Sequence, residues 1–318
     1  MRAPRLRAPV SPERFLRLAV GAVVALGLVV ASGAFVRLTG SGLGCDNWPR
    51  CGSTPFPAQD FHAIVEFGNR VVALGGIAAA LVAWLASRRV AELDRRVRLV
   101  ALGAFLGTIA QIPLGGLTVI LELHPLAVMS HFLLALVVVA LSVIVALEAW
   151  SRVSGLGAPV APAWVRLVAL VGLVGCAGMV VTGAIATASG PHPGADDAVE
   201  RLGLEISDTV YVHVRATAAF GLGFLVVGWQ LLRIRHTAPG VVGLAGVLLA
   251  VLLLQMLVGE IQYRNALPWG LVLLHVTLGA AIWGLTVATV HALWRPPLAL
   301  VSASRRAVEP LGEPLQSR

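Results

Sequence analysis

Three histidines of this chain stand in stretches that are otherwise apolar. His131 lies in SHFLLAL, His213 in YVHVRAT and His275 in LLHVTLGA. An ionisable side chain in such a stretch costs about 2–3 kcal/mol on membrane-insertion scales, so it normally faces a cavity or a bound group. Imidazole ligates iron and zinc, and it also carries protons near neutral pH. These three residues are therefore candidate metal ligands or proton carriers.

The polar residues of the two halves of the chain repeat at an offset of 144 residues. The offset aligns QIPLG with QMLVG, and SHFLLAL with LHVTLGA. We interpret it as an internal duplication, which is common in membrane proteins. The aligned pairs are Gln111 and Gln255, Gly115 and Gly259, His131 and His275, and Asn69 and His213.

The second half of the chain can offer two imidazoles to one iron. His213 and His275, on facing helices at similar depth, can coordinate heme iron from both sides. Paired imidazoles also serve zinc or a proton relay, although zinc needs further ligands. In the first half Asn69 stands where the second has histidine, and Asn is a poor iron ligand. A heme held by His131 alone keeps one iron face open, which suits oxygen chemistry, unless the change is simple drift after duplication.

Charged side chains accompany Asn69 in the same apolar stretch. Glu66 lies three residues earlier on one helical face. Near a heme it could relay protons or stabilise positive charge on a substrate carbon, and the alternative is that it pairs with Arg70. Arg70 and Arg215 are candidates for binding heme propionates, but both could also extend to the membrane surface.

The composition is that of a membrane protein, with 58% hydrophobic and 13% charged residues among 318. A spanning helix needs about 20 mostly apolar residues. The spans are helical because lipid offers the backbone no hydrogen-bond partners, and a barrel would alternate in polarity. We expect the first span to be retained, not cleaved as a signal peptide, since no small-residue cleavage site follows it. The eight predicted spans are residues 16–37, 63–87, 98–120, 126–150, 164–187, 209–232, 239–260 and 269–294.

All basic residues are arginine, and they gather in both tails and in the second connection. With eight spans these segments share one side of the membrane, which the positive-inside rule makes cytoplasmic. The net charge of +8 thus reports topology and predicts no nucleic-acid partner. We expect a multi-pass protein of the cell (inner) membrane with both termini in the cytoplasm.

The spans divide into two four-helix halves joined by SRVSGLGAPVAPAW. The predicted fold is an all-α membrane protein whose eight transmembrane helices form two pseudo-symmetric four-helix bundles. The Pro-rich C-terminal tail is expected to have little order. The predicted organisation is a basic tail 1–15, an N-terminal half 16–150, a cytoplasmic linker 151–163, a C-terminal half 164–294 and a cytoplasmic tail 295–318.

Two of the three cysteines lie in the first outer loop, in GCDNWPRC. An oxidising compartment outside the membrane predicts a disulfide between Cys45 and Cys51, against the alternative of two free thiols. Cys176 lies inside the fifth span and is expected to be a packing residue.

These motifs resemble the heme A synthases of bacterial and mitochondrial inner membranes. The resemblance covers roughly residues 15 to 295. It rests on RLTGSGLGCDNWPRC in the first outer loop, EFGNR at the head of the second span and SHFLLAL in the fourth. It rests also on the histidines of YVHVRAT and LLHVTLGA.

The resemblance implies that the protein oxidises heme O to heme A, turning a ring methyl into a formyl group by successive hydroxylations. It implies heme B on His213 and His275 in the C-terminal half, and substrate heme O near His131 in the N-terminal half. Glu66 matches the family's essential glutamate, and the loop cysteines match its outer-loop pair. Heme O synthase and cytochrome oxidase assembly factors are expected partners, besides membrane lipid and a possible oligomer.

One residue departs from the family pattern, which reads Glu-x-x-His-Arg where this chain has Glu66 to Arg70 with Asn69. The missing histidine puts bis-His ligation of the substrate heme in doubt, but leaves the glutamate and arginine in place. His62 could substitute only if the helix end moved.

Two other classes of protein compete with the enzyme. An electron-transfer cytochrome predicts two saturated bis-His sites, which Asn69 argues against. A transporter predicts polar or broken helices near the bilayer midplane, whereas these polar residues cluster near the outer face. Four spans in each half also make the repeats parallel, unlike the commonest inverted-repeat transporter plan.

Overall fold

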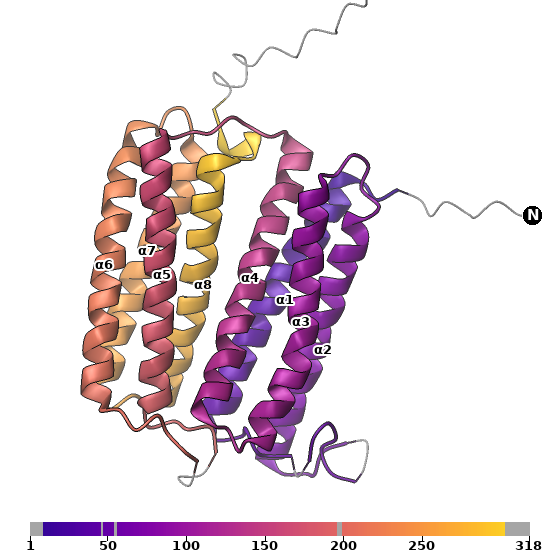
Figure 1. Cartoon of the computed structure of the whole chain (residues 1–318), viewed down its shortest axis with the longest axis vertical. Helices are drawn as coiled ribbons and strands as arrows, with labels where there is room; N and C mark the ends of the chain where they lie inside the picture. Colours follow the sequence, from indigo (N-terminus) through magenta and orange to yellow (C-terminus); the bar gives the residue numbers. More distant parts are fainter. Residues whose placement is uncertain (1–8, 46, 54–55, 196–198, 303–318) are drawn as a thin grey trace, which may run out of the picture.

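The computed structural model describes residues 9–45, 47–53, 56–195 and 199–302. Within these ranges the chain forms eight long helices, each of which contains the span predicted for it (Figure 1). All eight are long and apolar enough to cross a membrane. The predicted all-helical fold is therefore confirmed. The helices are α1 (Pro12–Leu38), α2 (Phe61–Ser87), α3 (Arg95–Ile120), α4 (Pro125–Ser154), α5 (Ala163–Ser189), α6 (Ile206–Arg233), α7 (Pro239–Arg264) and α8 (Trp269–Trp294).

Local signals in the sequence set several helix ends. The side chain of Asp60 accepts hydrogen bonds from the backbone N–H groups of His62 and Ala63, which caps α2. Asp94 caps α3 in the same way, and Ser11 caps α1. α1, α4 and α7 each begin with proline, which lacks the N–H that a first helical turn leaves unbonded.

The helices form two groups of four that lie side by side (Figure 1). In the first group α1 packs against α2 and α4, and α3 packs against α4. In the second group α5 packs against α6 and α8, and α7 packs against α8. Contacts of α8 with α1 and α4, and of α4 with α5, join the groups along one seam. The paired arrangement agrees with the two four-helix bundles predicted from the duplication.

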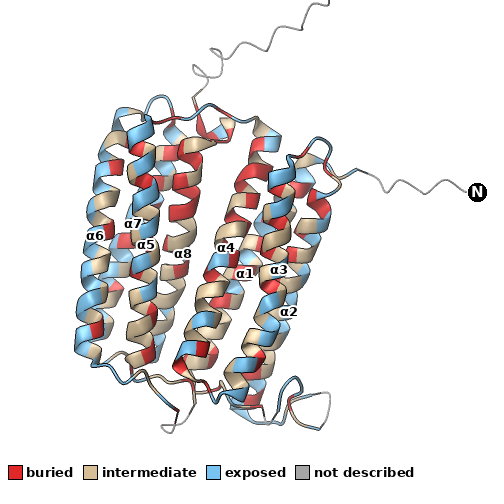
Figure 2. Cartoon of the chain, in the orientation of Figure 1, coloured by how far each residue is buried: buried red, intermediate tan, exposed pale blue. Residues whose placement is uncertain are grey.

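Burial follows the pattern of a protein in lipid, not that of one in water (Figure 2). Large apolar side chains point outward, and Leu74, Val174 and Leu222 are each more than 60% exposed. The interior of the first bundle is lined instead by small residues such as Ala83 and Ala101. Small residues let helix backbones approach closely, which is what stabilises helix association when the solvent is itself apolar.

A buried carboxylate joins the two bundles at the end where α4 and α8 finish. Glu148 of α4 accepts two hydrogen bonds from Arg295, at 2.6 and 3.1 Å, and lies 3.2 Å from His291 Nε2. The hydrogen bond to this carboxylate raises the pKa of Arg295. Further along the seam, Trp283 Nε1 donates to the carbonyl of Leu136 at 2.8 Å. The bundles are thus held together by specific polar contacts as well as by packing.

The two tails are more ordered near the helices than the sequence predicts. α1 begins at Pro12, inside the predicted tail 1–15, and Phe15 is fully buried. The expectation of little order is wrong for the first part of the tail 295–318. Pro296 and Pro297 are fully buried, and a short helix, η1 (Leu298–Leu300), packs against α4 and α7. Residues 1–8 and 303–318 lie outside the described residues.

Replacing Glu148 with Gln should lower the free energy of unfolding. The change leaves Arg295 without a carboxylate partner at a largely buried site. Losing hydrogen bonds to a charged group lowers the free energy of unfolding by about 1–3 kcal/mol. We expect a value near the lower end of this range, because Arg295 is partly exposed. The buried thiol of Cys176 reports unfolding when a thiol-reactive dye is present during a thermal ramp in detergent. The transition should fall by several degrees.

Glu260→Gln is the matched control, because Glu260 forms an exposed ion pair with Arg264 on α7 alone. It should leave the transition unchanged. An unchanged transition for Glu148→Gln would mean that the seam does not depend on this carboxylate.

Candidate functional site

The N-terminal bundle contains a cavity of about 500 Å³, within the usual size range of small-molecule sites. Its wall comes from α1 to α4, from the first outer loop, and from residues of α5 and α8 in the other bundle. The predicted site residues Glu66, Asn69, Arg70 and His131 all line it. Residues far apart in the sequence are thus gathered around one space.

The carboxylate of Glu66 joins α2 to the first outer loop. Glu66 is 5% exposed, and its Oε2 accepts a hydrogen bond from the backbone N–H of Cys45 at 2.8 Å. Its other oxygen pairs with the guanidinium of Arg70, one turn along the same helix. Both oxygens are therefore engaged, so the carboxylate is fixed at the wall of the cavity.

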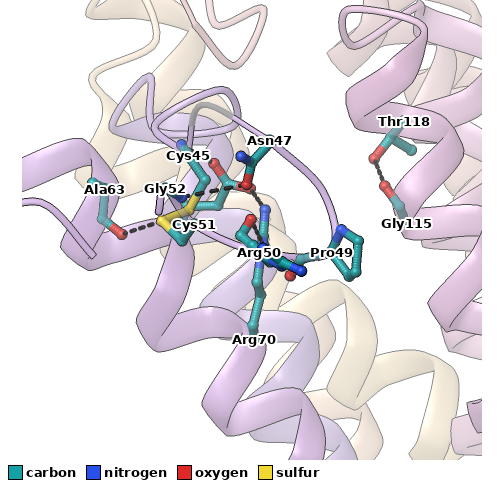
Figure 3. Close-up of polar contacts among 11 residues, drawn as sticks. Cys45, Asn47, Pro49, Arg50, Cys51, Gly52, Ala63, Arg70, Gly115 and Thr118 are labelled. Carbon is teal, nitrogen blue, oxygen red and sulfur yellow. Dashed lines mark hydrogen bonds and ion pairs between the residues drawn. A yellow bond between two sulfur atoms is a disulfide. The ribbon is translucent and has the colours of Figure 1, made fainter. Parts of the chain in front are cut away.

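Arg70 fastens the same loop from the other side (Figure 3). Its Nη1 donates to the backbone carbonyls of Pro49 at 3.0 Å and of Arg50 at 2.8 Å. Glu66 therefore pairs with Arg70, which was the alternative interpretation of this carboxylate from the sequence. The ion pair holds the carboxylate at the cavity wall. Most donors of Arg70 are used within the protein, which leaves little capacity for a ligand carboxylate.

The predicted disulfide between Cys45 and Cys51 is confirmed, and both residues are buried against Ala63 (Figure 3). The loop approaches the first turn of α2 so closely that a Cβ at Gly44 would lie 2.4 Å from the backbone carbonyl of His62. Only glycine fits there, because it has no Cβ. This approach is what brings the N–H of Cys45 to Glu66.

His131 enters the cavity from α4. The side-chain Nε2 of Gln111 on α3 donates to the backbone carbonyl of His131 at 3.1 Å. Gly115, one turn further along α3, leaves room for the ring, since a Cβ there would lie 3.2 Å from Cε1 of His131. The Nδ1 atom of His131 is buried without a hydrogen-bond partner among the described residues. An unpaired imidazole beside an open space suits a ligand.

Asn69 presents its amide to the same cavity, but its oxygen is occupied. Ser32 on α1 donates to Asn69 Oδ1 at 2.7 Å. Asparagine ligates metal ions through that oxygen, so this hydrogen bond makes ligation less favourable. The remaining polar group of the side chain is the amide NH₂, which can only donate.

The second bundle brings the rings of His213 and His275 together edge to face, with centroids 6.3 Å apart and ring planes at 74°. Metal–imidazole bonds of about 2 Å on both sides of one ion would separate the ring centres by roughly 6 Å. His213 Nδ1 lies 3.0 Å from the carbonyl of Met179, a contact that leaves Nε2 available for a metal. The donor set therefore fits heme iron. The described residues form no group of three or more metal-binding side chains such as zinc prefers.

The duplicated residues make equivalent contacts in the two bundles. Gln255 donates to the carbonyl of His275 at 3.0 Å, as Gln111 does to His131. Thr182 lies 3.3 Å from His213 Nδ1, as Ser32 bonds Asn69. Sequence reasoning missed this last pair because α1 and α5 align only after a gap, although both carry a hydroxyl residue followed by Gly-Ala.

Other predicted positions differ in detail. His213 lies two turns inside α6, which begins at Ile206, not at the head of the span. Arg215 is exposed and lies over the ring of Tyr211 on its own helix, so its observed contacts are away from the histidine pair. His62 contacts Ser41 through Nδ1 at 3.0 Å at the start of α2.

Trp48 and Arg37 also line the cavity, and neither was predicted as a site residue from the sequence. Trp48 lies against Gly116 of α3, where a Cβ would come within 2.8 Å of its ring. Arg37, in the last turn of α1, lines the cavity and donates to backbone carbonyls of the second bundle. An arginine in the last turn of a spanning helix resembles a surface anchor, and its place at the start of the RLTGSGLGCDNWPRC motif is the sequence signal that could have identified it.

Fold and site together define a multi-pass helical membrane protein with an internal repeat and paired histidines in one half. The model of the cytochrome oxidase assembly protein (COX15-CtaA) family matches residues 16–287. The chain belongs to this family, which confirms the resemblance to the heme A synthases.

Curated relatives carry the name heme A synthase. The Symbiobacterium thermophilum protein is 40% identical over 108 residues, 33% of this chain and 35% of the relative. The Geobacillus kaustophilus protein is 31% identical over 109 residues, 33% of each chain. The match to each of these two relatives spans about a third of the relative's length. The Shewanella oneidensis protein is 26% identical over 84% of this chain and 93% of its own.

Replacing Gly44 with Ala should detach the disulfide loop from α2. The new Cβ would overlap the backbone at His62, which cannot move as a side chain can. The disulfide, which is buried in the wild type, should become accessible in the variant. A water-soluble phosphine should therefore reduce it several-fold faster in the variant. The measurement is the rate of thiol labelling in the folded protein.

Gly68→Ala on α2 is the control, because its Cβ would meet nothing within 4 Å. If the disulfide were reduced at the wild-type rate in both variants, the position of the loop would not depend on Gly44.

Proposed function

We propose that this protein oxidises heme O to heme A in the membrane. The observation that carries the proposal is the asymmetry of two matched bundles. One presents two imidazoles to each other, whereas the other presents a single imidazole, a carboxylate and an amide to a cavity. The name carried by the relatives supports the same reaction.

The C-terminal half, residues 164–294, is the proposed heme B domain. His213 and His275 would hold the iron, and a bis-His heme supplies one-electron transfer. The Met179 carbonyl orients the His213 ring, and the contacts of Gln255 with the backbone position His275. Val276, next to His275, lines the cavity of the first bundle. The two sites are therefore adjacent along α8.

The N-terminal half, residues 16–150, is the proposed substrate domain. His131 would bind the iron of heme O, and Asn69 would leave its opposite face open for dioxygen. Two imidazoles would saturate the iron, whereas one imidazole allows oxygen chemistry. The apolar wall of the cavity, shared with α8, would keep water from the reacting carbon.

Glu66 is the proposed catalytic residue. Cys45 and Arg70 hold its carboxylate rigidly at the cavity wall. A fixed negative charge there would stabilise positive charge that develops on the ring methyl, and it could accept protons as that carbon is oxidised.

The overall change is balanced by dioxygen and an electron donor. Two hydroxylations of one methyl consume two molecules of dioxygen, four electrons and four protons. The resulting geminal diol loses water to give the formyl group, so three molecules of water are released in all. The four electrons would come from a one-electron donor.

The protein would work in the cell (inner) membrane with both termini in the cytoplasm, as its arginine distribution indicates. Its proposed partners are membrane lipid, the heme O synthase that supplies its substrate, and the assembly factors of cytochrome oxidase. In this arrangement the disulfide loop faces the oxidising side of the membrane.

Replacing Glu66 with Gln should abolish heme A formation while leaving heme B bound. Gln keeps the shape of the side chain but removes the negative charge that the mechanism needs. The test is extraction and chromatography of heme from cells that make heme O and express each variant. We expect at least a hundredfold loss of heme A.

Glu260→Gln, an exposed carboxylate of α7, should retain heme A at the wild-type level. Bound heme B with no heme A from the wild type would show an electron-transfer cytochrome. Equal heme A from Glu66→Gln would remove Glu66 from the mechanism.

Replacing Asn69 with His should close the open iron face. Ser32 contacts Asn69 as Thr182 contacts His213, so an imidazole at position 69 would face His131. Protein loaded with ferric heme O should change from a high-spin to a low-spin electron paramagnetic resonance spectrum, after subtraction of the unloaded protein, and heme A formation should fall. A low-spin bis-imidazole spectrum in the wild type would contradict the single-histidine site.

A further inference from the structure

Arg37 is the cation of the substrate cavity whose charge no described carboxylate balances. It lies in the last turn of α1 and reaches across the seam between the bundles. Its Nε donates to the carbonyl of His192 at 2.9 Å and its Nη2 to the carbonyl of Thr187 at 3.0 Å. These acceptors are dipoles, not charges, so the described residues leave the positive charge uncompensated.

The other charged groups at the cavity wall neutralise each other. Arg70 pairs with Glu66 and also binds loop carbonyls. Among the described lining residues, Arg37 therefore supplies the excess positive charge. A charge removed from water is costly unless it is paired, which makes this position attractive to an anionic part of a ligand.

The surrounding backbone holds Arg37 in place against the cavity. Gly194 lines the cavity beside it, with a left-handed φ of 118°, and its carbonyl accepts from Gly42 N–H at 2.8 Å. His192 Nε2 lies 2.8 Å from the carbonyl of Leu267, which ties this loop to the next one. The guanidinium is thus positioned by the last turns of α5 and by the loop that follows it before any ligand binds.

We propose that Arg37 binds a propionate carboxylate of the substrate porphyrin, an inference that rests on the proposed function. A guanidinium has five N–H donors in a planar fork, and two of its nitrogens already donate to the protein. The remaining donors suit a carboxylate, which forms its strongest hydrogen bonds with arginine. Substrate binding would then link the two bundles, because Arg37 belongs to one and its carbonyl partners to the other.

A purely structural role for Arg37 predicts different behaviour. An arginine that only clamps the two bundles would affect every ligand equally, whereas a carboxylate subsite distinguishes an acid from its ester. Ferric heme O and its dimethyl ester differ in those groups alone, so the ratio of their affinities reports the subsite.

The test is titration of both porphyrins into the full-length protein in nanodiscs, followed by Soret absorbance and corrected for partition into empty nanodiscs. The wild type should bind the acid about tenfold more tightly than the ester. Arg37→Gln should bind the two alike, at the affinity of the ester for the wild type. Arg37→Lys should keep part of the preference, since it retains the charge but not the fork.

Several results would overturn the subsite. Equal affinities of the wild type for acid and ester would do so without any variant, even if Arg37→Gln failed to fold. So would an undiminished preference in Arg37→Gln, or an equal loss of acid and ester binding. The dye transition of Cys176 checks that the variant is folded.

Failure of the proposed reaction would look different. A wild type that makes no heme A but prefers porphyrin acids through Arg37 would keep the subsite and lose the reaction. Heme A formation at the wild-type rate by Arg37→Gln, with the acid preference intact, would keep the reaction and lose the subsite.

Discussion

A polar side chain inside a membrane bundle has no water to bind, so its partners must come from the protein or from a ligand. Most polar atoms of this protein obey that constraint with short internal contacts, such as the hydrogen bond from Cys45 to Glu66. Several buried polar atoms are exceptions, among them Arg98 Nε and Arg166 Nε, and two of them belong to the proposed heme ligands. His131 Nδ1 and His275 Nδ1 are buried without partners among the described residues. Unpaired imidazole nitrogens at these two positions support the proposed ligand sites.

The two bundles share one scaffold and differ at one decisive position. Each places a histidine whose backbone carbonyl accepts from a glutamine, and each places a hydroxyl residue against the facing side chain. That facing side chain is His213 in one bundle and Asn69 in the other. An imidazole ring and an amide differ as iron ligands, so this substitution contributes to the difference between the proposed electron-transfer site and the proposed reactive one.

The cavity of the first bundle is completed by parts from outside it. The disulfide loop closes it above Glu66, and α5, α8 and the loop around His192 supply one wall. Because Arg37 reaches across the seam, the proposed substrate site would belong to the whole protein and not to one half. This arrangement explains why a duplicated fold remains a single functional unit.

The sequence by itself determined the eight spans, the disulfide and the pairing of His213 with His275. Long apolar runs are local properties, which lipid translates directly into helices, and the duplicated pattern can be read by comparing the two halves of the sequence. Tertiary structure alone decided which polar groups meet. It turned Arg37 into the cavity and Arg215 away from the histidines, and it packed Pro297 of the tail against the helices. These outcomes depend on how distant segments approach each other, and that approach leaves no periodic signal in the sequence.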